Sequence, residues 1–200
     1  MPRVGLTTDA VVDAAIDEID QNGVDALTLA AVAKRCGVAA PSLYKHVRDL
    51  GHVRSLVAAR ITEALAEHLL PEVTGRSGYE ALSGLMRAWR AYVRHHPRRY
   101  DAVLLDPLRD AVVRPAGVRL LELLLAVLRG YGLDGPEAIH QARCVRSALH
   151  GFVSLEAGGG FGMEEDVDLS FERLIDMVAG SLADAGRRRG DLPAAGGRPA

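Results

Sequence analysis

A short run of polar side chains near the N-terminus has the chemistry needed to contact nucleic acid. Hydroxyl, ammonium, imidazole and guanidinium groups follow one another closely at Ser42, Tyr44, Lys45, His46 and Arg48. Such groups donate hydrogen bonds to phosphate oxygens and to base edges. No acidic residue lies between Lys34 and Arg48, so the stretch is positively charged. We therefore predict that these residues face DNA.

The charge of the whole chain gives no such signal. Its 200 residues include 24 basic and 26 acidic side chains, for a formal net charge of −2. Overall electrostatic attraction therefore does not indicate a nucleic-acid partner. The prediction depends on the local arrangement of the polar run.

Two short predicted helices would position the polar run. Thr28 is an expected N-cap for a helix over 29–36, and Gly37 supplies a tight turn after it. Pro41 is acceptable in the first turn of a third helix, whose Leu43 and Val47 point inward and leave Ser42, Tyr44, Lys45 and His46 outside. This spacing predicts a helix-turn-helix, whose second helix fits the major groove of DNA. An ordinary helical hairpin is the less favoured interpretation.

The remaining sequence also has helical periodicity and no strand alternation. We predict further helices over 8–22, 50–70 with Pro71 at its end, 79–96, 98–105, 115–131, 137–156 and 169–185. The expected fold is all-α, with a helix-turn-helix DNA-binding domain at 1–50 and a helical ligand-binding and dimerisation domain at 51–186. The glycine- and arginine-rich residues 187–200 are expected to form a disordered tail.

Residues 8–57 resemble the tetracycline-repressor (TetR) family of bacterial regulators. The residues that carry the resemblance are Asn22-Gly23, Leu27-Thr28, Ala33, Gly37-Val38 and Pro41-Ser42-Leu43-Tyr44-Lys45-His46-Val47. The resemblance implies that Thr28 and Tyr44 contact phosphates, and that His46 contacts the DNA backbone. It also implies that Pro41, Ser42 and Lys45 lie against base edges. Leu50 stands where family members usually have a lysine that contacts a phosphate.

The C-terminal half is similar to the family subgroup with a WHG-type ligand-binding domain. Residues 89–104 and 148–161 carry this similarity, with Trp89, His150 and Gly151 at signature positions. Aromatic and imidazole groups gather here, and the predicted pocket for a small-molecule effector consists of Trp89, Tyr92, His96, Tyr100 and His150, beside His95. An equally favoured interpretation makes these residues part of the core.

The sequence indicates no enzyme, metal site or cofactor. It has no nucleophile elbow, phosphate-binding glycine loop or HExxH motif. Cys36 and Cys144 are far apart, and His140 with Cys144 on one helix face indicates packing more than metal binding. No apolar stretch or signal peptide points to a membrane or to export, so we expect a cytoplasmic protein.

The last two predicted helices carry more apolar residues than one packing face needs. These are Ile139, Val145, Ala148, Leu149, Phe152 and Val153, then Leu169, Leu174, Ile175, Val178 and Leu182. The surplus predicts a four-helix interface between two chains. The leading hypothesis is a homodimeric, ligand-responsive repressor that binds a double-stranded DNA operator. The alternative is a helical small-molecule-binding protein with a degenerate DNA-binding domain, prompted by Leu50 and by the acidic first helix.

Overall fold

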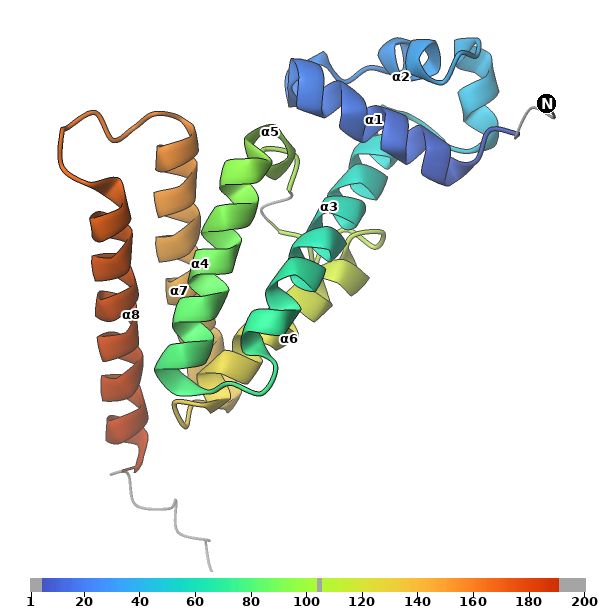
Figure 1. Cartoon of the computed structure of the whole chain (residues 1–200). Helices are drawn as coiled ribbons and strands as arrows, with labels where there is room; N and C mark the ends of the chain where they lie inside the picture. The colour runs from blue at the N-terminus through green and yellow to red at the C-terminus, as the bar shows by residue number, and fades with distance from the viewer. Residues whose placement is uncertain (1–4, 104–105, 191–200) are drawn as a thin grey trace, which may run out of the picture. The chain divides into compact units, whose positions relative to one another are not determined.

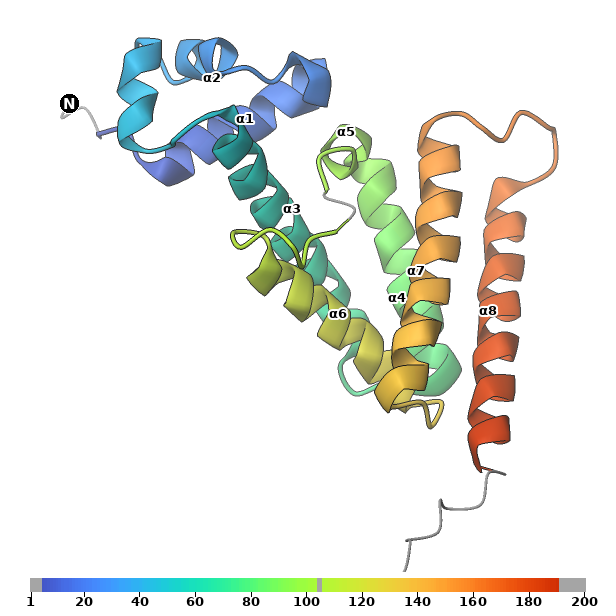
Figure 2. The same ribbon diagram turned by 180° about the vertical axis from the view of Figure 1, so that it is seen from behind.

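The computed structural model describes residues 5–103 and 106–190, and every regular element in these ranges is a helix (Figure 1, Figure 2). In chain order they are α1 (Thr8–Asn22), η1 (Val24–Ala26), α2 (Leu29–Arg35), η2 (Ala40–Lys45), α3 (Leu50–Val73), α4 (Gly78–His95), α5 (Pro97–Tyr100), α6 (Arg114–Arg129), α7 (Gly135–Ala157) and α8 (Val167–Gly190), where η marks a 3-10 helix. The predicted all-α fold class is confirmed.

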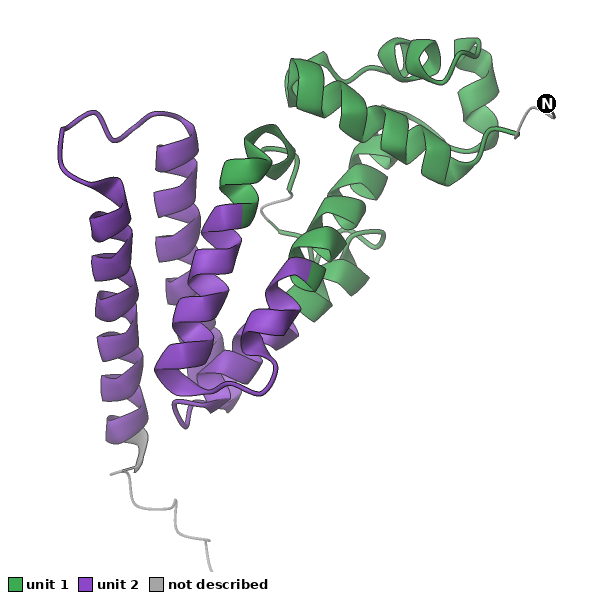
Figure 3. Cartoon of the chain, viewed as in Figure 1, with its two compact units in different colours: residues 1–67, 92–120 green, residues 68–91, 121–200 purple. Residues whose placement is uncertain are grey.

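The chain forms two compact units (Figure 3). Unit 1 comprises 1–67 and 92–120, and unit 2 comprises 68–91 and 121–200. The long helices α3 and α4 each contribute residues to both units. The division by function at residue 50 stays a prediction.

The first helix begins and ends where the sequence predicts. The Thr7 side chain accepts a hydrogen bond from the Ala10 N–H at 3.1 Å, and Gly23, with φ 85°, ends the helix. The apolar side chains of α1, α2 and η2 form one small core. Its buried members are Val11, Val12, Ala15, Ile16, Ile19, Leu27, Val32, Ala33, Leu43 and Val47.

Helix α3 is longer than predicted, because Pro71 does not end it. Pro71 lies in its last turn, and the helix continues to Val73. Beyond the proline, both the N–H and the hydroxyl of Thr74 donate to the Leu70 carbonyl, at 3.0 and 2.8 Å. A proline this close to a helix end removes one backbone hydrogen bond, and the neighbouring bonds hold the turn.

The other helices differ from prediction mainly at their ends. Helix α5 covers only Pro97–Tyr100, whereas a helix over 98–105 was predicted; residues 104–105 lie outside the described residues. Helix α8 continues to Gly190, so the prediction of disorder is wrong for 187–190. The remainder of the predicted tail, 191–200, lies outside the described residues.

A buried arginine joins α4, α7 and α8 within unit 2. Arg90 is 8% exposed, and its guanidinium donates to Glu156 at 2.8 and 2.5 Å and to Asp168 at 2.6 Å. The same guanidinium lies over the Phe171 ring, 4.7 Å from its centre. Because both carboxylates and an aromatic face satisfy it, Arg90 can remain charged inside the unit.

Most of the apolar surplus predicted on the last two helices lies inside the chain. Its buried members are Val145, Leu149, Val153, Ile175, Val178 and Leu182. Of the other members, Ile139 and Leu169 are exposed. The six buried side chains are already enclosed in the single chain, so they do not support the argument for a second chain.

Candidate nucleic-acid interface

Helix α2 is capped at its start by a residue predicted to contact phosphate. Thr28 is exposed, and its hydroxyl oxygen accepts a hydrogen bond from the Ala31 N–H at 3.1 Å. The cap uses the oxygen only as an acceptor, so the hydroxyl hydrogen remains available as a donor. Thr28 can therefore cap the helix and bind a phosphate oxygen at the same time.

The predicted glycine turn joins α2 to η2. Gly37 has φ 65°, its N–H donates to the Lys34 carbonyl at 3.2 Å, and the Val38 N–H donates to the Ala33 carbonyl at 3.0 Å. These two bonds form a Schellman motif. The motif requires one residue in the left-handed conformation, which glycine adopts without strain. The turn fixes the direction in which η2 leaves α2.

The predicted recognition helix is a 3-10 helix. The Ser42 N–H donates to the Ala39 carbonyl at 2.9 Å, and the His46 N–H donates to the Leu43 carbonyl at 2.8 Å. With three residues per turn, Ser42 and Lys45 fall in one row of side chains. Leu43 and Val47 are 0% and 2% exposed, so they anchor the helix in the core as predicted.

The candidate DNA-contacting residues on η2 and just after it divide into exposed and half-buried groups. Pro41, Tyr44, Lys45 and Arg48 are exposed, and Tyr44 is 60% exposed. Ser42 and His46 are half-buried, although all the polar residues were expected to face outward. Within the described part of the chain, the Tyr44 hydroxyl and the Lys45 ammonium make no hydrogen bond or ion pair. They are available for an anionic partner.

One of the cations in this stretch is used inside the protein. Arg35 on α2 forms an ion pair with Glu18 on α1, and it donates to Gln21 at 2.7 Å. Glu18 is 8% exposed, and the hydrogen bond from Arg35, aided by Asn22, lowers its pKa. The cations left for DNA are therefore Lys34, Lys45 and Arg48.

Three more acidic residues of α1 are also paired within unit 1. Arg60 on α3 contacts Asp9 at 2.6 Å and Asp13 at 3.0 Å. Arg99 on α5 contacts Asp20 at 2.6 Å. Arginines that are far away in sequence therefore balance these carboxylates. The acidic first helix no longer supports a degenerate DNA-binding domain.

The start of α3 has a cap in place of the lysine usual in the family. The Asp49 carboxylate accepts a hydrogen bond from the His52 N–H at 2.7 Å. The His52 imidazole in turn accepts one from the Arg48 N–H at 3.2 Å. Leu50 is half-buried and offers no charge to a phosphate. The Leu50 side chain therefore cannot make the phosphate contact that a lysine makes at this position in other family members.

The residues of the predicted effector pocket are mostly enclosed. Trp89, Tyr92 and Tyr100 are 6%, 7% and 7% exposed, and His96 and His150 are half-buried. The rings of Tyr92 and His96 lie 5.1 Å apart between centres. Enclosure is compatible with both interpretations, a core and a pocket, so the pocket stays a prediction.

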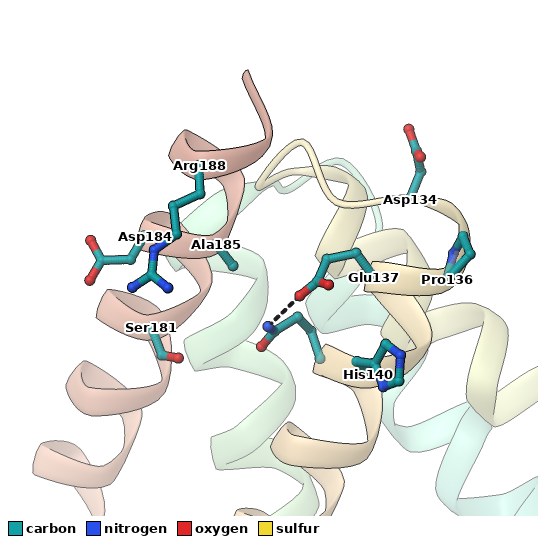
Figure 4. Close-up of a pocket in the computed structure, with 9 residues that line it drawn as sticks. Asp134, Pro136, Glu137, His140, Ser181, Asp184, Ala185 and Arg188 are labelled. Carbon is teal, nitrogen blue, oxygen red and sulfur yellow. Dashed lines mark hydrogen bonds between the residues drawn. The ribbon is translucent and has the colours of Figure 1, made fainter. Parts of the chain in front are cut away.

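A groove of about 870 Å³ lies elsewhere, between the start of α7 and the end of α8 (Figure 4). Glu137 and His140 of α7 line it with Asp184 and Arg188 of α8. Glu137 accepts a hydrogen bond from Gln141 at 2.8 Å. None of the residues predicted for the effector pocket lines this groove.

In the described ranges, no group of three or more His, Cys, Asp or Glu side chains could hold a metal ion. No helix in those ranges is long and apolar enough to cross a membrane.

The long-range pairs Glu18–Arg35 and Asp20–Arg99 were not predicted from the sequence. The only signal for them was indirect: α1 has no basic residue in its last turn to balance its helix dipole.

Family models match both parts of the chain. Residues 11–48 match the model for bacterial regulatory proteins of the tetR family. Residues 82–178 match the model for the tetracyclin repressor-like C-terminal domain. Assignment to the WHG-type subgroup stays a prediction.

Relatives cover nearly the whole chain. It is 38% identical over 174 residues to the uncharacterized HTH-type transcriptional regulator YobS of Bacillus subtilis (strain 168), covering 85% of this chain and 90% of the relative. It is 35% identical over 183 residues to the uncharacterized HTH-type transcriptional regulator Rv0681 of Mycobacterium tuberculosis, covering 88% and 82%. Apo ActR from Streptomyces coelicolor has the same fold, with a TM-score of 0.70 at 18% identity, covering 94% of this chain and 100% of ActR. The chain therefore belongs to the TetR family and is a DNA-binding transcriptional regulator.

Proposed function

We propose that the protein is a cytoplasmic, homodimeric repressor whose binding to a double-stranded operator is weakened by a small-molecule effector. The observation that carries the DNA-binding part is the exposed, unpaired Lys45 and Tyr44 on an η2 helix anchored by Leu43. Two copies would insert their η2 helices in successive major grooves. We call the α1–η2 segment of each copy, residues 8–45, its reading head. An effector would act by changing the separation or mobility of the two reading heads.

The DNA contacts divide by chemistry. Thr28, Tyr44 and Arg48 can donate to phosphate oxygens, and His46 would contact the backbone close to them. Lys45, with Ser42 in its row and Pro41 at the start of η2, would face base edges. Phosphate contacts fix register, whereas base contacts carry sequence information. We expect most of the sequence preference to come from Lys45.

Two glycines support a dimer better than the apolar residues first predicted. Gly151 and Gly180 lie inside α7 and α8, where glycine costs about 1 kcal/mol relative to alanine. A Cβ atom added at either position would meet nothing within 4 Å. Nothing inside the chain therefore requires glycine there. Close approach of a second copy would require it, and the exposed Leu155 and Met177, 54% and 64% exposed, lie on the same two helices.

Unit 1 holds a buried polar group that an effector could satisfy. Thr62 on α3 is fully buried, and its hydroxyl has no hydrogen-bond partner among the described residues. Such a group costs about 1 to 3 kcal/mol when it stays unsatisfied. The Tyr92 hydroxyl lies 3.5 Å from the carbonyl of Ile61, the residue before Thr62. Burial raises the pKa of Tyr92, which keeps it a neutral donor. We expect an effector with an acceptor group for the Thr62 hydroxyl to bind near Tyr92, His96 and Tyr100.

Transcription from a promoter that carries the operator tests the sign of regulation. The operator would first be isolated by selecting random duplexes with the full-length protein. We expect a reporter with this site across its promoter to be transcribed less when the protein is present. A reporter with the scrambled site is the control. Unchanged transcription, or activation, would contradict a repressor.

A further inference from the structure

The last turn of α1 is held by two consecutive arginines of α5. Arg98 donates to the backbone carbonyl of Asp20 at 3.0 Å and also to the carbonyl of Gln21. Arg99 grips the Asp20 carboxylate with two nitrogens, at 2.6 and 2.8 Å. One arginine therefore caps the helix end, and the other binds its side chain.

This contact adds to the Gly23 cap a positive charge that the last turn of α1 lacks. A helix end has unpaired carbonyls and a partial negative charge, which cations in the last turn usually balance. The last turn of α1 contains no basic residue. The balancing charge comes instead from Arg98 and Arg99, which are 78 and 79 positions from Asp20 in sequence.

The turn before α6 is fastened to the same part of the protein. Asp110 accepts a hydrogen bond from the Ser55 hydroxyl on α3 at 2.6 Å, and this bond lowers the pKa of Asp110. Its other oxygen accepts from the N–H groups of Val112 and Val113, at 2.8 and 3.2 Å. Helix α5 thus contacts α1, which precedes η2 in the chain, and this turn contacts α3, which follows it.

We propose that Arg98 and Arg99 are positioning residues for DNA binding: their grip on α1 holds the reading head in its binding orientation. The Arg99 and Asp20 side chains are 29% and 32% exposed. An ion pair so exposed adds little to folding stability. Its planar two-point geometry does restrict the angle between α1 and α5. A reading head held in advance loses less freedom when it binds DNA.

The proposal adds a regulatory consequence that rests on the proposed function. Only His96 separates α4 from α5, and the predicted effector pocket includes this residue and Tyr92 in the last turns of α4. A ligand that moved the end of α4 would displace Arg98 and Arg99 and weaken their contacts with α1. Release of α1 would then free the reading head.

Variants of the pair test the proposal in full-length protein. We expect Arg99→Ala to bind the selected operator at least about 5-fold more weakly, the lower end of usual coupling effects. It should also accept operators whose half-sites are one base pair closer or farther apart. Asp20→Ala should do the same, and the double variant should lose no more than either single variant. Arg99→Lys, which keeps the charge but loses the two-point grip, should resemble Arg99→Ala.

The matched control is Arg109→Ala. Arg109 is exposed, and among the described residues its ion-pair partner is Asp106, in its own segment, so its loss should change neither affinity nor spacing preference. Melting temperatures should be similar for all variants. Parent-like affinity and spacing in Arg99→Ala, or losses that add in the double variant, would overturn the proposal. If the parent protein itself selects a single half-site, the dimer is contradicted instead, and the affinities still decide the role of Arg99.

Discussion

The Gly151→Leu variant is expected to be a monomer that binds the operator about 10²- to 10⁴-fold more weakly than the parent protein, because the second reading head no longer benefits from being linked to the first. A Cβ atom at this position would meet nothing within 4 Å in the single chain, so we expect the leucine side chain to extend outward. It would therefore block a second copy without disturbing the fold. Leucine is also a better helix former than glycine, so the folded monomer should be at least as stable.

Light scattering at micromolar concentration, melting curves and operator binding would be measured together. The parent protein should scatter as twice its 21.4 kDa mass, and Gly151→Leu as one copy. The matched control is Glu122→Leu, which adds a leucine at an exposed position on α6. A dimeric Gly151→Leu, or a Glu122→Leu that also dissociates, would show that α7 does not form the interface as proposed.

The Lys45→Ala variant is expected to lose about 1 to 3 kcal/mol of binding per half-site, the usual value of a good contact to a base edge. It should also change the preferred base at one operator position. The Lys45 side chain is exposed and unpaired, so its removal leaves the fold intact. The measurement is a repeated selection from random duplexes with the parent protein and the variant.

Tyr44→Phe is the matched comparison for Lys45→Ala. It removes only a hydroxyl, and the expected loss is about 0.5 to 1.5 kcal/mol per half-site with the same selected sequence. A changed sequence for Tyr44→Phe, together with an unchanged one for Lys45→Ala, would reverse the assigned roles.

The helix-turn-helix could be predicted from the sequence because interactions between residues close together in the chain determine it. The Thr28 cap, the left-handed Gly37 and the inward Leu43 each depend on neighbours a few residues away. Where sequence reasoning failed, the cause was usually distant in the chain. Arg35 and Arg99 are 17 and 79 residues from the carboxylates that they bind, and no local pattern reports such a pairing.

The dimer argument shows the same limit. Apolar periodicity on α7 and α8 cannot distinguish a face buried within one chain from a face that meets another chain. The residues that indicate the outer face are those whose type nothing inside the chain explains, such as Gly151 and Gly180.

The salt dependence of binding to the selected operator tests the central claim most directly. Lys34, Lys45 and Arg48 would displace counterions as they approach phosphates. With about six phosphate contacts for a dimer, the logarithm of the affinity should fall against the logarithm of salt concentration with a slope near −5. A steep fall of this order is the result that we expect for the parent protein. An affinity that does not change with salt would contradict the placement of these residues against DNA.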